Sequence, residues 1–203
     1  MNRIYFTAVP LESNFVLETM PLNPANFRLD TRLTECAFPI VSIIDATLQP
    51  GDTATVVAVR QQNTAANKNM DILRQELESM GRPNWVLRDL AVPESQNKDL
   101  LLGLFAEMIG CMQDDTCYYA CMTFGTKTYP VVLFSALSYA DKICRNTQIC
   151  GIYYREVRRQ QGKTRESHLY DVTALFTLNA LVDMVAGMEC NAKDQMIREM
   201  LEL

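Results

Sequence analysis

Two apolar patterns alternate regularly along most of the chain. Short apolar runs such as TVVAV, Thr55–Val59, follow turn residues and are typical of buried strands. Between them lie longer segments whose apolar residues recur every three or four positions, as in amphipathic helices. Repeated alternation of this kind favours a parallel sheet with helices on both faces. The expected strands are 3–9, 53–61, 85–92, 116–122 and 148–157, and the expected helices are 38–48, 69–80, 99–112 and 129–144.

The last quarter of the chain breaks this rhythm. After the fifth strand come REVRRQQGKTRES and HLYDV, which predict a hairpin turned at Gly162 and an added antiparallel edge strand. Helical spacing then returns over 173–188 and 193–201. The sequence therefore predicts an α/β, Rossmann-like, mostly parallel sheet with helices on both faces, plus an antiparallel C-terminal hairpin and closing helices. The expected division is a domain over 1–172 and a helical extension over 173–203.

The connection between the first strand and the first helix is unusually long. It runs over 10–37, whereas strand-to-helix connections typically have about 2–6 residues. Two similar stretches within it, NFVLET at 14–19 and NFRLDT at 26–31, are expected to form the arms of a small hairpin. This link is interpreted either as a lid over a ligand or as a surface elaboration without one.

The segment TFGTKTYP, Thr123–Pro130, follows the fourth strand and precedes a helix. Ligands of open parallel sheets bind at the carboxyl ends of the strands, where the strand order reverses. In the order 3-2-1-4-5 this turn and the long link face the same crevice. Gly125 permits a tight turn, and a helix N-terminus with Lys127 attracts phosphate. The alternative is that the threonines only cap the helix, because the turn lacks the spacing of the known glycine-rich phosphate loops.

Composition excludes several classes of function. The net charge of −5 and the pI near 5.0 argue against binding to long nucleic acid, which generally needs a basic face. No apolar stretch reaches the ~20 residues of a membrane span. Seven scattered cysteines without a Cys-x-x-Cys pair, and no signal segment, favour free thiols in the cytoplasm. We expect no metal site, no cofactor and no membrane partner.

Several segments together resemble one family. The TFGTKTYP turn, the DATLQPGDTATVV passage into the second strand and the LYDVTALFTLNALV segment are similar to CRISPR-associated Rossmann-fold (CARF) domains, with Phe124 standing where the commoner form of the turn has glycine. The resemblance spans roughly 1–185. It implies binding of a cyclic oligoadenylate, with cyclic tetra-adenylate as the first candidate, in a pocket shared by two subunits in type III CRISPR antiviral signalling. The implied contacts are Thr7, Ala8, Pro10, Ser13, Asn14, Thr123, Phe124, Gly125, Thr126 and Lys127.

The sequence is compatible with three functions. The first is a dimeric sensor that binds the messenger and passes the signal to an effector protein. The second is a metal-independent ring nuclease, in which Lys127 and Thr123 assist attack by the ribose 2′-hydroxyl. The third is an unrelated nucleotide-using Rossmann enzyme, although an acidic ribose-binding residue after a glycine-rich first turn is missing.

The remaining polar residues have structural interpretations as well. His168 is expected on the hairpin in an exposed or packing role, and Cys117 and Cys121 are expected to be core thiols. A basic cluster around the hairpin turn is taken as a solvated surface rather than an RNA or partner surface. It consists of Arg155, Arg158, Arg159, Lys163 and Arg165.

Overall fold

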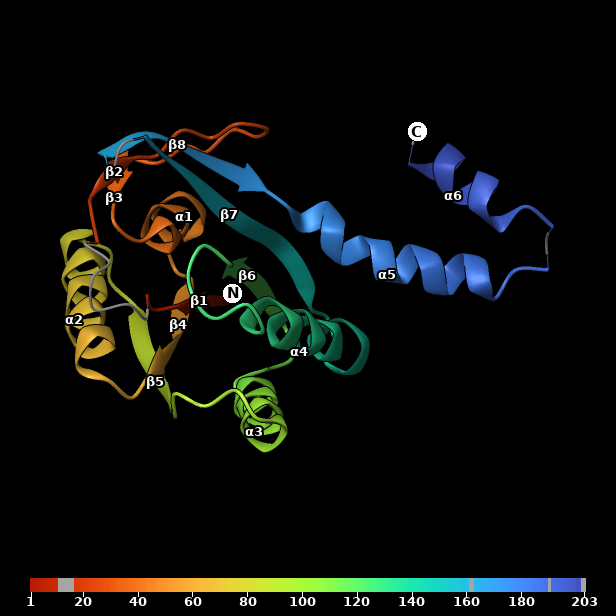
Figure 1. Cartoon of the computed structure of the whole chain (residues 1–203), viewed down its shortest axis with the longest axis horizontal. Coiled ribbons are helices and arrows are strands. Elements are labelled where there is room, and N and C mark those ends of the chain that lie inside the picture. Colours follow the sequence, from red (N-terminus) through yellow and green to blue (C-terminus); the bar gives the residue numbers. More distant parts are fainter. Residues whose placement is uncertain (11–16, 161–162, 190, 202–203) are drawn as a thin grey trace.

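The computed structural model describes residues 1–10, 17–160, 163–189 and 191–201. Its centre is a six-stranded sheet in the order β5-β4-β1-β6-β7-β8 (Figure 1). The first five strands are parallel, and β8 pairs antiparallel with β7. The predicted α/β class is therefore confirmed, and so is the order 3-2-1-4-5 of the five parallel strands. The strands are β1 (Asn2–Ala8), β4 (Thr53–Gln61), β5 (Trp85–Val92), β6 (Thr116–Cys121), β7 (Gln148–Gln160) and β8 (Lys163–Asp171).

Four helices cover the two faces of this sheet. On one face lie α1 (Pro39–Thr47) and α2 (Thr64–Ser79), and on the other lie α3 (Lys98–Ile109) and α4 (Tyr129–Ile143). Side chains of β1 alternate between them, since Tyr5 joins the first core and Ile4 and Phe6 join the second. Because both faces are covered, the runs of the central strands β1, β4 and β6 are continuously rather than alternately buried.

Helices α2 and α3 begin earlier than predicted, because each is capped by an asparagine in a polar stretch before its apolar residues. Helix α2 begins five residues before its predicted start, because Asn63 accepts a hydrogen bond from the backbone N–H of Ala66 at 2.8 Å. Asn97 caps α3 in the same way, through the N–H of Leu100 at 3.0 Å. The apolar spacing marks only the buried part of each helix, and the cap extends it outward.

The long link does not form the predicted hairpin arms. Its antiparallel pair consists of β2 (Met20–Pro21) and β3 (Glu35–Cys36), and residues 26–31 are not in a strand. Instead, residues 23–26 run along β8 and cover its outer edge: Leu169 donates its N–H to Asn23 and accepts one from Ala25. An edge strand with unpaired backbone groups can pair with another chain, so this contact protects β8 from such pairing. Residues 11–16 of the link, and the turn expected at Gly162, lie outside the described residues.

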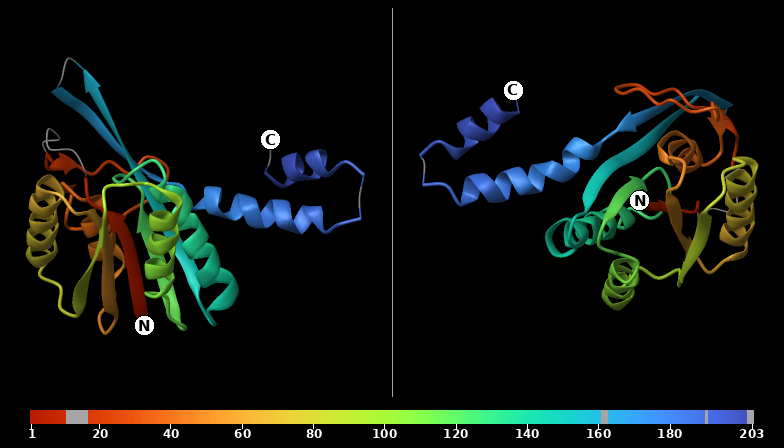
Figure 2. Two further views of the ribbon diagram at one scale, coloured as in Figure 1. Left: turned by 60° about the horizontal axis from the view of Figure 1, so that its bottom comes forward. Right: turned by 180° about the vertical axis from the view of Figure 1, so that it is seen from behind.

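The chain ends in two helices, α5 (Thr173–Ala186) and α6 (Lys193–Met200), which extend away from the α/β body (Figures 1 and 2). Helix α5 begins where Asp171 accepts a hydrogen bond from the Thr173 N–H at 2.9 Å. Phe176 packs edge-on against Phe134 of α4, with ring centroids 5.9 Å apart. None of the helices in the described ranges has the length and apolarity needed to cross a membrane.

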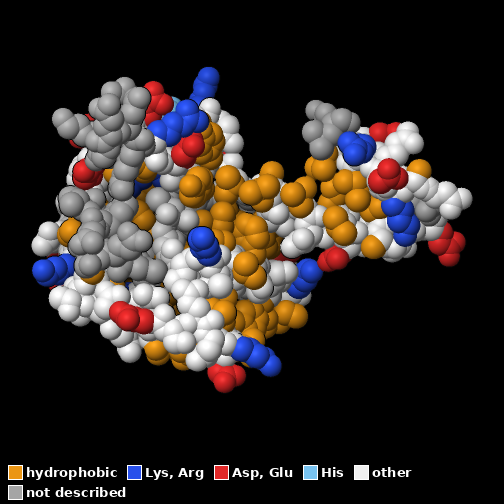
Figure 3. Space-filling model, in the orientation of Figure 1, with side chains coloured by type: hydrophobic (Ala, Val, Ile, Leu, Met, Phe, Trp, Pro, Cys, Tyr) orange, Lys and Arg blue, Asp and Glu red, His pale blue; other side chains and the backbone are white. Residues whose placement is uncertain are grey.

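Hydrophobic side chains gather on one surface of the molecule, over α4 and along the C-terminal helices (Figure 3). On α4, Val131 is 68% exposed and Ile143 is 62% exposed. Leu175 and Val182 of α5 are each half exposed. Apolar surface of this kind on a small domain is typical of a contact with another protein.

Candidate functional site

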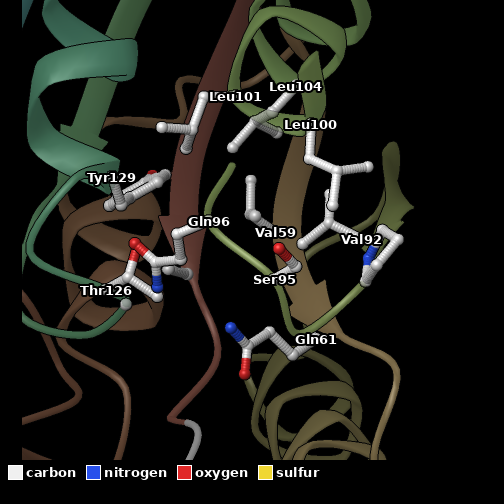
Figure 4. Close-up of a pocket in the computed structure, with 13 residues that line it drawn as sticks. Val59, Gln61, Val92, Ser95, Gln96, Leu100, Leu101, Leu104, Thr126 and Tyr129 are labelled. Carbon is white, nitrogen blue, oxygen red and sulfur yellow. The ribbon is translucent and has the colours of Figure 1, made fainter. Parts of the chain in front are cut away.

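A pocket lies at the carboxyl ends of β1, β4 and β5, on the face that carries α3 and α4 (Figure 4). The empty space in this pocket, including space open to solvent, is about 440 Å³. Its wall is mostly apolar, with polar groups towards one end, where Gln61, Ser95 and Gln96 lie together (Figure 4). Its lining comprises Ala8, Val59, Gln61, Val92, Pro93, Ser95, Gln96, Leu100, Leu101, Leu104, Gly125, Thr126 and Tyr129.

The turn between β6 and α4 forms one side of this pocket. Gly125 has a φ of +109°, and a Cβ at this position would lie 3.0 Å from the Ala8 Cβ and 3.1 Å from the Tyr129 Cδ1. Glycine is therefore required both by backbone conformation and by space. The turn can approach β1 this closely only without a side chain at this position.

The backbone N–H groups of the turn that precedes α4 are unpaired among the described residues, whereas those of Tyr129 and Val131 in the helix itself donate to the carbonyl oxygens of Thr126 and Thr128. Within the described chain, the N–H groups of residues 125–128 have no acceptor, and the N-cap residue Thr128 makes no side-chain capping bond. The threonine hydroxyls form other hydrogen bonds. The hydroxyl oxygens of Thr126 and Thr128 lie 2.9 Å apart, and the Thr128 hydroxyl donates to the side-chain oxygen of Gln96 at 2.5 Å. The capping interpretation is therefore wrong for these hydroxyls, because the loop after β5 competes for them.

Lys127 stands at the tip of this turn. Its side chain is exposed, and no hydrogen-bond or salt-bridge partner for it exists in the part of the chain that the structure describes. A free ammonium group beside unoccupied N–H groups at the positive end of a helix is a local anion-binding arrangement. This arrangement suits an acidic protein, because its positive potential is confined to one spot.

Tyr129 is the first residue of α4 and lines the pocket. Only 2% of it is exposed, and its hydroxyl has no hydrogen-bond partner among the residues that the structure describes. Burial raises the pKa of this phenol above its ordinary value, so the hydroxyl stays protonated and can donate. A buried hydroxyl without a partner is uncommon, because its desolvation is not compensated.

The opposite side of the same turn faces the protein interior. Thr123 accepts a hydrogen bond from the backbone N–H of Arg155 at 2.9 Å, and its hydroxyl lies 3.1 Å from the Cys121 sulfur. The Phe124 ring packs edge-on against Phe38 of the α1 entry, with centroids 5.4 Å apart. Thr123 and Phe124 therefore fix the turn to β7 and to the long link, on the side away from the pocket.

Arg155 was expected in a solvated cluster, and this prediction is wrong for it. The residue is 2% exposed, with its guanidinium carbon 5.9 Å from the centre of the Phe124 ring. It donates to the carbonyl oxygens of Cys36, at 2.8 Å, and Ala37. Burial lowers the pKa of Arg155. The long link covers this strand face, which alternation in sequence alone does not reveal.

The rest of that cluster is described only in part. Arg158 is exposed and pairs with Glu156 at 3.3 Å, as expected of a solvated hairpin. The side chains of residues 159–165 lie outside what the structure describes. His168 lies near Glu166, at 3.7 Å, on β8, and Cys117 and Cys121 are buried free thiols as expected.

Besides Thr123, Phe124 and Lys127, the predicted contact residues separate into three groups. Ala8, Gly125 and Thr126 line the pocket. Thr7 is buried within β1, and the carbonyl oxygen of Pro10 accepts a hydrogen bond from Asn69 of α2 at 3.1 Å. Ser13 and Asn14 lie outside the described residues. No residue of the described link, 17–37, lines the pocket, so this part of the link does not form the expected lid.

Sequence reasoning missed Gln61, Gln96 and Tyr129. Ligands of open parallel sheets bind at the carboxyl ends of the strands. This applies to the turn after β6 and equally to the ends of β4 and β5, where Gln61 and Gln96 are found. Extending it to those strands would have identified both glutamines. Tyr129 had no comparable signal, because a tyrosine at a helix start is commonly a core residue.

Two further observations bear on the chemistry. Among the described residues, no group of three or more His, Cys, Asp or Glu side chains is placed to hold a metal ion. No protein-family model matches the chain, and no curated protein matches it. The site must therefore be interpreted from its own geometry.

Proposed function

We propose that this chain is a dimeric sensor of a cyclic oligoadenylate, with cyclic tetra-adenylate as the first candidate, acting in the cytoplasm in type III CRISPR antiviral signalling. The observation that carries the proposal is that two features adjoin each other. The unpaired N–H groups of the turn 125–128 and Lys127 suit a phosphate, and the apolar pocket that Gly125 and Thr126 of this turn line suits a base. The sequence resemblance to CARF domains is the reason for proposing a cyclic oligoadenylate rather than another nucleotide.

The turn between β6 and α4 supports the proposed binding of a phosphate group. Each unpaired N–H of residues 125–128, in the turn before α4, can donate to a phosphate oxygen, and the helix dipole favours the negative charge. Lys127 adds a charge-assisted hydrogen bond. Because a small ring needs only a few such contacts, the net charge of −5 does not oppose binding.

The apolar surface of α4 and α5, beside this turn, supports the proposed dimer. Helix α4 starts at the turn, and its exposed Val131 lies two residues beyond the first helical position. Pairing two copies through the apolar surface of α4 and α5 would bury these side chains and bring the two turns close to a common axis. A cyclic ligand with two-fold symmetry would then meet equivalent groups from each subunit.

The composition of the pocket favours binding over cleavage. None of the described lining residues is an Asp, Glu or His, so the pocket wall supplies no general base for the 2′-hydroxyl. The Thr123 hydroxyl, a candidate catalytic group, is held by Arg155 and Cys121 on the other side of the turn. These contacts support the sensor over the ring nuclease.

The decisive experiment is incubation of purified protein with cyclic tri-, tetra- and hexa-adenylate, followed by chromatography of the bound ligand. Recovery of an intact ring supports the sensor, and linear products support the nuclease. Failure to bind any of the three rings overturns the proposal. Light scattering of the free and bound protein tests the dimer, and a monomer in both states overturns that part.

Lys127→Ala tests the phosphate contact directly. Loss of a charge-assisted hydrogen bond of about 1.5–3 kcal/mol lowers affinity roughly ten- to a hundred-fold. The matched control is Lys68→Ala, an exposed lysine on α2 at the opposite face of the sheet. Near-normal affinity in a folded Lys127→Ala protein would show that the turn is only a helix start.

A further inference from the structure

Three sulfur atoms gather at the amino end of the sheet, away from the pocket. Cys117 is the second residue of β6, and its Sγ lies 3.8 Å from the Sδ of Met1. Cys150 is the third residue of β7, which pairs with β6. Because the three residues come from distant segments of the chain, only the assembled sheet brings them together.

A bulge places Cys150 beside Cys117. The register between β6 and β7 shifts between Tyr118 and Tyr119, and Cys150 is the additional residue of β7 at this point. Both cysteines pack against the core on the face of the sheet that carries α1 and α2. Burial, and next the neighbouring Cys117 thiol, raise the pKa of Cys150 to about 12. The two thiols therefore share one environment.

The three sulfur atoms are ligands of the kind that soft metal ions prefer. Thiolates and thioethers favour Cu⁺, whereas oxygen ligands suit magnesium, calcium and manganese. Two sulfur atoms bound to one ion at about 2.3 Å, the usual zinc–thiolate distance, lie roughly 3.7–4.0 Å apart in tetrahedral or trigonal geometry. The 3.8 Å between the Cys117 and Met1 sulfurs matches this separation. Cys117 is buried, but Cys150 is partly exposed and Met1 is exposed, so an ion can enter from solvent.

The charged groups beside the sulfurs suit a singly charged ion. Arg3 and the N-terminal amine both pair with Asp52, at 2.6 and 2.9 Å, which leaves this group with one net positive charge. Arg3 also acts on Cys150, whose pKa it lowers against the larger effect of burial. Cu⁺ held by two thiolates carries one net negative charge, which the positive group compensates. A divalent ion with two thiolates would be neutral and would leave the positive charge uncompensated.

Tyr119 supports the charged form of Cys150. Its hydroxyl accepts a hydrogen bond from Arg3 at 2.8 Å, and its own proton can be donated to the Cys150 sulfur. This hydrogen bond lowers the pKa of Cys150, again against the effect of burial. Neighbours of this kind orient metal ligands and keep them in the form that binds the ion.

We propose that Cys117, Cys150 and Met1 form a three-sulfur site for Cu⁺. The ion displaces the two thiol protons and keeps its oxidation state, so binding needs no oxidant or reductant. The site goes beyond the proposed function, because it shares no residue with the nucleotide pocket at the other end of the strands. Either one can therefore fail while the other stands.

The first test is titration of the reduced protein with Cu⁺ without oxygen, in competition with a coloured Cu⁺ chelator. We expect one tightly held ion per chain. Cys117→Ser and Cys150→Ser should each weaken binding at least about a hundredfold, the upper end of what the loss of a supporting neighbour of a metal ligand costs. The matched control is Cys144→Ser, since Cys144 is also partly exposed but ends α4 on the other face of the sheet. This control should bind like the wild type.

The second test concerns the thioether. Met1→Leu, produced by cleaving off a preceding tag so that leucine becomes the first residue, keeps an apolar side chain without a sulfur. Its affinity for Cu⁺ should fall about tenfold, because a neutral thioether holds the ion less strongly than a thiolate does. Unchanged affinity in this variant, with losses in both cysteine variants, overturns the three-sulfur site in favour of a two-thiolate one.

Thermal denaturation of the metal-free variants checks that each is folded. Cys150→Ser remains informative even if the more buried Cys117→Ser fails to fold, because Cys150 is partly exposed. Cu⁺ binding that Cys150→Ser and Cys144→Ser weaken equally would be adventitious binding to thiols and would overturn the site. Failure of the wild type to take Cu⁺ from the chelator would overturn it as well.

Discussion

The two ends of the central sheet differ in how their polar groups are satisfied. At the amino end, Asp52 pairs with the N-terminal amine at 2.9 Å and with Arg3 at 2.6 Å. Asp45 of α1 pairs with Arg82 at 3.0 Å and with Arg32 at 3.2 Å. At the carboxyl end, the Tyr129 hydroxyl and the Lys127 ammonium lack partners among the described residues.

This difference assigns separate roles to the two ends. Burial by itself raises the pKa of Asp45 and Asp52, but hydrogen bonds and positive charges outweigh it and lower both pKa values to about 2. These carboxylates therefore stabilise the fold. At the carboxyl end, the buried Tyr129 hydroxyl costs stability because it is unpaired among the described residues, whereas the exposed Lys127 ammonium contributes little to stability. Substitutions at the two ends should consequently affect different properties.

The largest effect is expected for Asp45→Ala at the amino end. It leaves Arg82 and the Arg32 backbone N–H without their acceptor, so the free energy of unfolding should fall by about 3 kcal/mol. Asp71→Ala is the control, since Asp71 forms an exposed pair with Arg74 on α2 and should cost less than about 1 kcal/mol. Equal losses in urea denaturation would contradict a structural role for the amino end.

Lowering the pH should progressively reduce the stability that the amino end contributes. Asp45 and Asp52 have folded-state pKa values of about 2, below the ordinary 3.8, so their stabilisation is complete above pH 3.8. It is lost as the pH falls from 3.8 towards 2. Unfolding free energies measured across this range should decline less steeply in Asp45→Ala than in the wild type. Identical slopes would show that the Asp45 carboxylate contributes nothing.

At the carboxyl end, Gly125→Ala should affect both stability and binding. The positive φ and the contact with Ala8 predict a loss of ~1–3 kcal/mol. Gly103→Ala is the control, because Gly103 lies in α3 with open space around it and alanine favours helices by about 1 kcal/mol. The prediction is wrong if thermal denaturation shows both variants equally stable, or if Gly125→Ala binds cyclic tetra-adenylate normally.

The smallest effect on stability is expected for Lys127→Ala. The exposed side chain makes no described contact, so the free energy of unfolding should change by less than about 0.5 kcal/mol. Affinity should nevertheless fall, as argued above. A loss of stability comparable to that of Gly125→Ala would mean that the lysine supports the fold, and would remove the contrast between the two ends.

Much of the fold could be predicted from local pattern. Strands 53–61 and 85–92 were placed with the observed ends, because turn residues flank buried apolar runs. The turn at Gly125 and its place at the carboxyl edge also followed from the chain order. The sequence could not place the link, since residues 20–36 take their conformation from contacts with β8 and Arg155, which are distant in the chain.

By itself, the sequence determined the class of fold, the order of elements and one side of the candidate site, because hydrophobic periodicity and turn chemistry act over a few residues. Tertiary structure decided which groups share an environment. It buried Arg155 beneath the link, turned Thr123 inward, and brought Gln61, Gln96 and Tyr129 together from three different segments. Burial and hydrogen bonding depend on neighbours in space, so these roles arise only when the sheet and its helices have packed.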